Sequence, residues 1–310
     1  MPSHTVEIVE VAPRDGLQNE QVQVSTPIKA ELVRRAVEAG LRRVEVTSFV
    51  NPQRVPQMAD AEALMQHVRT YPGLISIGLA MNRRGFDRAR AAGCNEVNMV
   101  VVASESLGRR NQGMSTAESI AIVREVGAAA REAGLPMSVT IAASFGCPFE
   151  GEVPEARVLA ILEQILPEAP LEIAFADTIG CGVPTQVASL LKQANALAPG
   201  MRLRCHFHNT RNTGLANVAA AVEAGARAID ASLGGTGGCP FAPGASGNVA
   251  TEDVAWMLDR MGVSTGVDLD KAVEAAQWLT AALGKQMAGG VAKAGLFPKE
   301  AARGGCVAVA

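Results

Sequence analysis

Several common ingredients are scarce in this sequence, and each absence narrows what the protein can be. No apolar run reaches 18 residues, so the sequence contains no candidate membrane span. Lysine and arginine total 28 against 31 aspartate and glutamate, which gives a formal net charge of −3 with no block of one sign. This balance argues against nucleic acid or an anionic membrane as the main partner.

Cysteine and aromatic residues are also sparse. The six cysteines are scattered, and no two have the close spacing of zinc ligands. In a chain of 310 residues this pattern indicates reduced thiols rather than a disulfide framework. Aromatic residues make up 4% of the chain, which favours an α/β enzyme over an all-β fold. Because the amino terminus lacks a signal-peptide pattern, we expect a soluble, cytoplasmic protein.

Strand and helix signals alternate along the chain. Thr26 is a plausible helix N-cap before Pro27, and Ser115 and Glu118 have capping-box spacing. Glycines close several helices a few residues before a strand. The predicted strands are residues 6–11, 43–49, 75–80, 96–103, 137–144, 172–178, 202–209 and 228–234. The predicted helices are residues 26–40, 60–70, 84–92, 115–134, 154–166, 184–197, 213–225, 251–262 and 269–283.

Eight such units predict an α/β fold of the (β/α)₈ TIM-barrel type. We expect a single catalytic domain over residues 1–310, with a helical extension and tail at about residues 265–310. A doubly wound open sheet is the competing fold. The absence of a glycine-rich phosphate fingerprint after the first strand disfavours it.

Two of the four histidines, His206 and His208, stand in one apolar strand. Alternate strand residues share a face, so both imidazoles would face one cavity, about 7 Å apart along the backbone. This arrangement suits a metal ion bound by two nitrogens. The alternative is a pair of buried histidines, each hydrogen-bonded to a neighbour.

Other polar residues recur where predicted strands end, which is where TIM barrels carry their chemistry. A carboxylate, two imidazoles and an amide oxygen suit an octahedral cation such as Mg²⁺ or Mn²⁺. An arginine there could neutralise a developing enolate, or form an ordinary salt bridge. A cysteine in a glycine-rich loop is either a reactive thiol or an inert buried one. These residues are Arg14, Asp15, Gln18, Glu45, Asp177, Thr178, Cys239 and Asn248.

Five phrases of the sequence resemble 3-hydroxy-3-methylglutaryl-CoA lyase, over roughly residues 5–270. Arg-Asp-Gly and His-x-His mark only the wider group of metal-dependent barrel lyases and Claisen-type synthases. The cysteine loop that runs into Gly-Ala-Ser-Gly-Asn is typical of the lyase branch. The matching phrases are Val-Ala-Pro-Arg-Asp-Gly-Leu-Gln-Asn-Glu, Thr-Ser-Phe-Val-Asn-Pro, Val-Pro-Gln-Met-Ala-Asp, Gly-Cys-Pro-Phe-Glu-Gly and Gly-Gly-Cys-Pro-Phe-Ala-Pro-Gly-Ala-Ser-Gly-Asn-Val-Ala-Thr-Glu-Asp.

The resemblance implies a retro-Claisen cleavage of an acyl-CoA to acetyl-CoA and acetoacetate, with a place in leucine degradation and ketone-body formation. It implies that Arg14 stabilises the enolate, that Cys239 is an acid/base residue on a mobile loop, and that Asp15 or His206 is the base. It also implies a homodimer or higher homo-oligomer. The implied cation ligands are Asp15, His206, His208 and Asn248, and the implied site-lining residues are Glu45, Gln18, Asp177 and Thr178.

Departures from the family pattern leave alternatives open. Asn209-Thr210-Arg211 stands where better-known lyases tend to have Asp-Thr-Tyr. The tail matches poorly, although Cys306 stands roughly where some members of the family carry a regulatory cysteine. Arg211 could meet an anionic substrate or cap the next helix. A related substrate such as citramalyl-CoA would use the same chemistry. A condensing synthase of the isopropylmalate or homocitrate type lacks the cysteine loop, and an inactive scaffold would have lost site residues.

Overall fold

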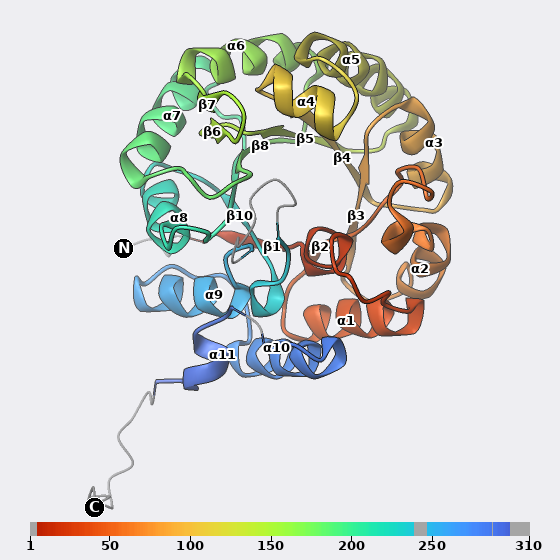
Figure 1. Ribbon diagram of the computed structural model, residues 1–310, viewed down its shortest axis with the longest axis vertical. Helices are drawn as coiled ribbons and strands as arrows, with labels where there is room; N and C mark the ends of the chain where they lie inside the picture. The colour runs from red at the N-terminus through yellow and green to blue at the C-terminus, as the bar shows by residue number, and fades with distance from the viewer. Residues whose placement is uncertain (1–4, 239–246, 287, 298–310) are drawn as a thin grey trace, which may run out of the picture.

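The structure is a computed structural model that describes residues 5–238, 247–286 and 288–297. Eight parallel strands close into a barrel in the order β1-β10-β9-β8-β5-β4-β3-β2 (Figure 1). The predicted (β/α)₈ TIM barrel is therefore confirmed. The strands are β1 (Glu7–Glu10), β2 (Arg43–Ser48), β3 (Ile75–Ala80), β4 (Glu96–Val102), β5 (Met137–Ala142), β8 (Glu172–Asp177), β9 (Leu203–Phe207) and β10 (Ala228–Ala231).

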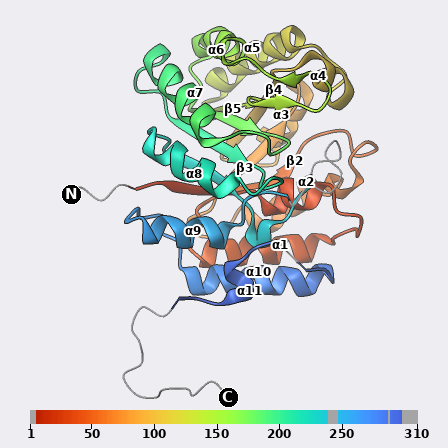
Figure 2. The same ribbon diagram turned by 60° about the vertical axis from the view of Figure 1, so that its left-hand side comes forward.

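Helices surround the barrel as an outer ring (Figures 1 and 2). The ring consists of α1 (Thr26–Glu38), α2 (Ala61–Val68), α3 (Arg83–Ala91), α5 (Thr116–Ala133), α6 (Glu155–Ile165), α7 (Pro184–Leu197), α8 (Gly214–Glu223) and α9 (Thr251–Arg260). The short α4 (Glu105–Asn111) lies inward of α5 in Figure 1. Two further helices, α10 (Leu269–Leu283) and α11 (Val291–Ala294), follow the last barrel unit.

The predicted element boundaries hold to within a few residues, with three corrections. The cap of α1 is Ser25 rather than Thr26, because Thr26 is already helical and its hydroxyl donates to Asp60 at 2.7 Å. The helix α4 and the antiparallel pair β6 (Gly146–Cys147) and β7 (Gly151–Glu152) were not predicted. The capping box of Ser115 and Glu118 is confirmed.

Apolar side chains form the main core between the strands and the helical ring. The barrel interior differs, because its apolar group is small and consists of Val9, Val11, Ile77 and Ala228. Charged and polar side chains fill much of the remaining interior, where TIM barrels usually hold branched apolar residues. Those that point inward and are buried include Arg43, Glu45, Glu96, Glu172, Arg204 and Asp230. The buried Asn98 joins them through its hydrogen bond to Glu45.

The carboxyl-terminal extension packs against the start of the chain. The guanidinium of Arg35 on α1 lies 4.7 Å above the ring of Trp278 on α10. The predicted tail beyond residue 297 lies outside the described residues. Within the described ranges, no helix is both long and apolar enough to cross a bilayer.

Candidate active site

Arg14 and Asp15 lie on a short helical turn, η1 (Ala12–Gly16), directly after β1. The start of the turn is held by the last residue of β1, because the Glu10 carboxylate accepts the Ala12 N–H at 2.7 Å. Gly16 makes close packing possible on the other side. A Cβ at this position would lie 2.5 Å from Thr236 Oγ1, so a larger residue would push the turn away from the loop after β10.

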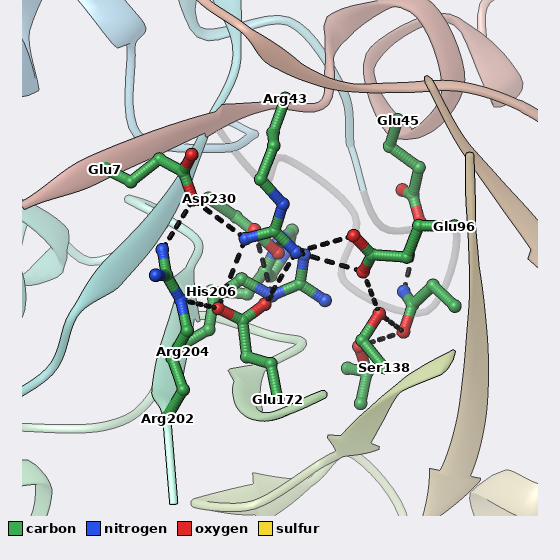
Figure 3. Close-up of polar contacts among 12 residues, drawn as sticks. Glu7, Arg43, Glu45, Glu96, Ser138, Glu172, Arg202, Arg204, His206 and Asp230 are labelled. Carbon is green, nitrogen blue, oxygen red and sulfur yellow. Dashed lines mark hydrogen bonds and ion pairs between the residues drawn. The ribbon is translucent and has the colours of Figure 1, made fainter. Parts of the chain in front are cut away.

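His206 lies on β9 and His208 directly follows this strand, and both line the same cavity, as the strand alternation predicts. Both residues are buried, and their ring centroids are 5.2 Å apart. Asp230 on β10 pairs with His206 in register, and its Oδ2 lies 3.1 Å from His206 Nδ1 (Figure 3). This contact leaves Nε2 of His206 free for another partner.

Asp15, His206 and His208 can each present a ligand atom within 4.8 Å of the others. Asn248 adjoins them, since its Nδ2 donates to Asp15 Oδ2 at 2.7 Å and its backbone bridges to His208. Two polar atoms in this group, His208 Nδ1 and Asn248 Oδ1, are buried and have no hydrogen-bond partner among the described residues. A carboxylate, two imidazoles and an amide oxygen with an unused lone pair form a donor set that fits a divalent cation.

The charges of the site favour the metal-binding protonation states of Asp15 and His208, but not that of His206. Burial raises the pKa of Asp15, but the charge of Arg14 and then of the two imidazoles brings it well below its usual range. Burial lowers the pKa of His206, yet the Asp230 hydrogen bond and the Asp15 charge raise it above its ordinary value. Burial and then His206 lower the pKa of His208 to about 4, so this imidazole is neutral at pH 7.

Arg14 is held by two carboxylates at the edge of the same group. Its Nε donates to Glu45 Oε2 at 2.6 Å, and its Nη1 donates to Asp15 Oδ1 at 2.7 Å. Glu45 is in turn fixed by Asn98 Nδ2 at 3.0 Å. The guanidinium therefore has a defined orientation beside the candidate cation site.

A cavity of about 630 Å³ lies at the carboxyl ends of the strands. Arg14, Asp15 and the two histidines line it. Its volume is in the range of small-molecule sites. Gln18 and Thr178, both predicted to line the site, do line this cavity, and so do Arg54, Asn82 and Gln112.

Two predicted site residues have other positions. The Asp177 carboxylate accepts the N–H groups of Cys181 and Gly182, each at 2.9 Å, and does not line the cavity. Its oxygens hold the turn after β8, and its predicted contact with substrate stays a prediction. Glu45 is also absent from the cavity lining and acts on the site through Arg14.

The two residues after the histidines that depart from the family pattern also stabilise loops. Asn209 Oδ1 accepts the Gly214 N–H at 3.0 Å at the start of α8. Arg211 Nη1 donates to the carbonyls of Ile179 and Gly180, at 3.0 and 2.9 Å. Arg211 thus does not cap the next helix, and it is not among the residues that line the cavity. Its cation ties the loop after β9 to the loop after β8.

The predicted acid/base residue Cys239 and the tail residue Cys306 lie outside the described residues. The described start of the cysteine loop is held by two buried carboxylates. Glu10 accepts the Leu233 N–H at 3.1 Å, and Glu252 accepts the Gly234 N–H at 3.1 Å.

Replacing Glu252 by glutamine is expected to flatten the dependence of stability on alkaline pH. Burial raises the pKa of Glu252 to about 8, with smaller contributions from Asp253 and Glu10, and burial raises the pKa of Glu10 to about 7. A raised carboxyl pKa gives stability that is complete below pH 4.5 and is lost as the pH rises through 7 and 8.

The measurement is the melting temperature between pH 6 and pH 9. The melting temperature of the wild type should fall more over this pH range than that of the Glu252→Gln variant. Each kcal/mol lost from the free energy of unfolding corresponds to roughly 2–4 °C of melting temperature. Glu223→Gln, on the exposed end of α8, is the matched control and should follow the wild type. Equal slopes for all three proteins would contradict the assigned role of Glu252.

Sequence reasoning missed the aspartate that orients His206 and a glutamine in the cavity wall. Asp230 had a weak signal, a single charge inside the apolar strand Ala-Ile-Asp-Ala. Gln112 had none, although both its amide atoms are buried without a hydrogen-bond partner among the described residues. It follows α4, the helix that the sequence pattern did not reveal.

Comparisons with known proteins agree on one family. The HMGL-like family model matches residues 5–279. An (R)-citramalyl-CoA lyase of Chloroflexus aurantiacus is 44% identical over 95% of this chain and 96% of its own. A cytoplasmic 3-hydroxy-3-methylglutaryl-CoA lyase of Mus musculus is 42% identical over 93% and 84%. The solved structure of an Acinetobacter baumannii HMG-CoA lyase with coenzyme A and 3-methylmalate has a TM-score of 0.90, 39% identity, and coverage of 96% and 98%.

Proposed function

Because the chain belongs to the HMGL-like family, we propose that it cleaves 3-hydroxy-3-methylglutaryl-CoA to acetyl-CoA and acetoacetate. The reaction is a retro-Claisen cleavage by a carbon–carbon lyase. One observation carries the proposal, which is the convergence of Asp15, His206 and His208 beside Arg14 on a single cavity, with Asn248 hydrogen-bonded to Asp15. The barrel supplies this group from the turn after β1, the end of β9 and the segment after β10.

The four converging residues would hold a divalent cation, Mg²⁺ or Mn²⁺. When bound, the cation supplies Lewis acidity toward the substrate hydroxyl and a neighbouring oxygen. A base, Asp15 or His206, removes the hydroxyl proton, and the hydroxyl-bearing carbon becomes the ketone of acetoacetate. The bond to the neighbouring methylene breaks, and its electron pair passes into the acetyl-CoA thioester as an enolate.

Arg14 contributes a fixed positive charge where that enolate forms, because Glu45 and Asp15 hold its guanidinium in place. Protonation of the enolate carbon completes acetyl-CoA, and we assign this proton to Cys239. His208 remains neutral and serves only as a ligand. On the resemblance alone, we also propose a cytoplasmic homodimer or higher homo-oligomer. A role in leucine degradation and ketone-body formation would require that the enzyme releases acetoacetate.

A second candidate substrate is citramalyl-CoA, favoured by the 44% identity to the Chloroflexus aurantiacus lyase. The two substrates differ by one methylene between the carbinol carbon and the carboxylate. A pocket discriminates one methylene by roughly 10–200-fold. The chemistry at the cation site is the same for both, so only the cavity wall can select between them.

The deciding experiment measures acetyl-CoA release with Mg²⁺ for both thioesters, with chelator-treated protein as the control. We expect hydroxymethylglutaryl-CoA to give the higher kcat/KM, with acetoacetate formed in equal amount. Cleavage of citramalyl-CoA alone would reassign the substrate and keep the mechanism. Absence of cleavage of any 3-hydroxyacyl-CoA would refute the lyase function.

A further inference from the structure

Beneath the candidate cation site, the barrel holds a cluster of buried charges, which we call the barrel cluster (Figure 3). Three carboxylates meet two guanidinium groups, and every member is at most 6% exposed. Removing a charge from water costs several kcal/mol, so each carboxylate needs its own compensation. The members of the barrel cluster are Arg43, Glu96, Glu172, Arg204 and Asp230.

Two of the three carboxylates are well compensated without Arg204. Arg43 Nη2 donates to both oxygens of Glu96 at 2.9 Å and to Glu172 Oε1 at 3.1 Å. Arg202 Nε adds a further hydrogen bond to Glu172 at 2.8 Å. Glu172 therefore keeps two cationic partners if Arg204 is removed.

Asp230, by contrast, would lose its permanently charged ion-pair partner among the described residues if Arg204 were removed. Among the described residues its ion-pair partners are His206, at 3.1 Å from Oδ2, and Arg204, whose Nε is 3.4 Å from Oδ1. The arginine contact is one of charge, since neither Asp230 Oδ1 nor Arg204 Nε makes an aligned hydrogen bond in the described structure. Arg204 is thus the permanent cation on the side of Asp230 that faces away from His206.

The strand register explains this placement. Arg204 and His206 are two residues apart on β9, so their side chains share the inner face of the barrel. Asp230 pairs with His206, and Ala228 pairs with Arg204, so the small alanine leaves room for the guanidinium one layer below the carboxylate. The chain Arg204–Asp230–His206 leads from the barrel cluster to the cation site.

We propose that Arg204 is a positioning residue for the cation site: its charge holds the Asp230 carboxylate against His206 Nδ1, so that His206 presents Nε2 to the cation. The inference rests on the cation site of the proposed function. An arginine with a solely structural role would be expected to use its N–H groups in hydrogen bonds. Arg204 Nη2, however, is buried without a hydrogen-bond partner among the described residues. Carboxylates that orient a metal-binding histidine typically change metal affinity by about 10–100-fold.

The test measures the Kd of the full-length protein for Mn²⁺ by electron paramagnetic resonance of free Mn²⁺, without any acyl-CoA. Arg204→Gln removes the charge and should raise the Kd by about 10–100-fold. Arg204→Lys keeps the charge and should restore most of the affinity. Arg202→Gln is the matched control, because Arg202 also pairs with Glu172 but does not contact Asp230, and its Kd should equal that of the wild type.

The thermal melting of each variant separates folding from positioning. A folded Arg204→Gln protein with a Kd within twofold of wild type would overturn the proposal. Should that variant not fold, Asp230→Asn and the double variant Arg204→Gln/Asp230→Asn, which removes both charges of the pair, decide. Asp230→Asn alone should weaken Mn²⁺ binding, and the arginine change should add nothing to it. Additive effects would mean that Arg204 does not act through Asp230.

The same measurement separates this inference from the proposed function. A wild-type protein that binds Mn²⁺ but cleaves no 3-hydroxyacyl-CoA would refute the lyase function and leave the role of Arg204 intact. A wild-type protein that fails to bind Mn²⁺ would refute both. Normal cleavage with an unchanged Kd in Arg204→Gln would refute the inference alone.

Discussion

Replacing Asp15 by asparagine is expected to lower turnover by about 10²–10⁴-fold even at saturating cation, the usual contribution of a general base. Asp15 is 22% exposed at the cavity, while its two oxygens accept from Arg14 and Asn248, each at 2.7 Å. Asparagine keeps the size but loses the charge that both the cation and Arg14 need. Cation affinity should therefore fall as well.

The parallel variant His206→Asn tells the two candidate bases apart. It removes a proposed ligand, so its Mn²⁺ Kd should also rise. At saturating Mn²⁺, however, it should recover more turnover than Asp15→Asn does, because His206 is tied to Asp230 through Nδ1. His67→Asn, on the exposed side of α2, is the control for surface effects. Full recovery by Asp15→Asn and none by His206→Asn would make His206 the base.

The second large effect is expected at Arg14. Arg14→Met should lower kcat by about 10²–10³-fold, the usual loss when one donor to a developing oxyanion is removed, with KM changed little. Arg14→Lys should restore only part of this activity. A single ammonium cannot reproduce the fork that contacts Glu45 at 2.6 Å and Asp15 at 2.7 Å together.

Glu45→Gln is the informative companion to the arginine variants. Glu45 acts through Arg14 and keeps Asn98 as a partner, so its loss should reduce kcat less than Arg14→Met does. Melting curves are needed for each protein, because Arg14→Met leaves a carboxylate that is only 2% exposed without its cation. A kcat within tenfold of wild type for folded Arg14→Met would contradict enolate stabilisation by this residue.

The repeating part of the fold was predictable from local patterns. Strand β3 and helices α7 and α10 begin and end where the sequence pattern places them. Helix α4 escaped because its 7 residues, Glu-Ser-Leu-Gly-Arg-Arg-Asn, are too few to show an apolar period. The cap of α1 was displaced by a tertiary contact, since the Thr26 hydroxyl bonds Asp60, which lies 34 residues away.

In the candidate site, too, the residues marked by a local sequence pattern could be predicted, whereas those brought together by long-range contacts could not. Asp15 and the two histidines could be found because a strand end or an alternating pair marks them. The barrel cluster could not, because Arg43 and Glu172 meet across 129 residues of sequence and each looks like an ordinary strand charge by itself. Asp177 shows why a position at a strand end is ambiguous by itself. Its position at a strand end resembles that of a site residue, yet its oxygens serve the turn that follows.

The place of the four proposed ligands in the strand order has a consequence for how the barrel forms. Asp15 follows β1, the histidines lie at the end of β9, and Asn248 follows β10, which is the strand between β1 and β9. A cation held there would connect Asp15 to Asn248, which are 233 residues apart. It would therefore stabilise the closure of the barrel between its first and last strands. By mass action, loading at 100 times the Kd adds about 2.7 kcal/mol to the free energy of unfolding. The proposed catalytic cation would therefore also contribute to the stability of the closed barrel.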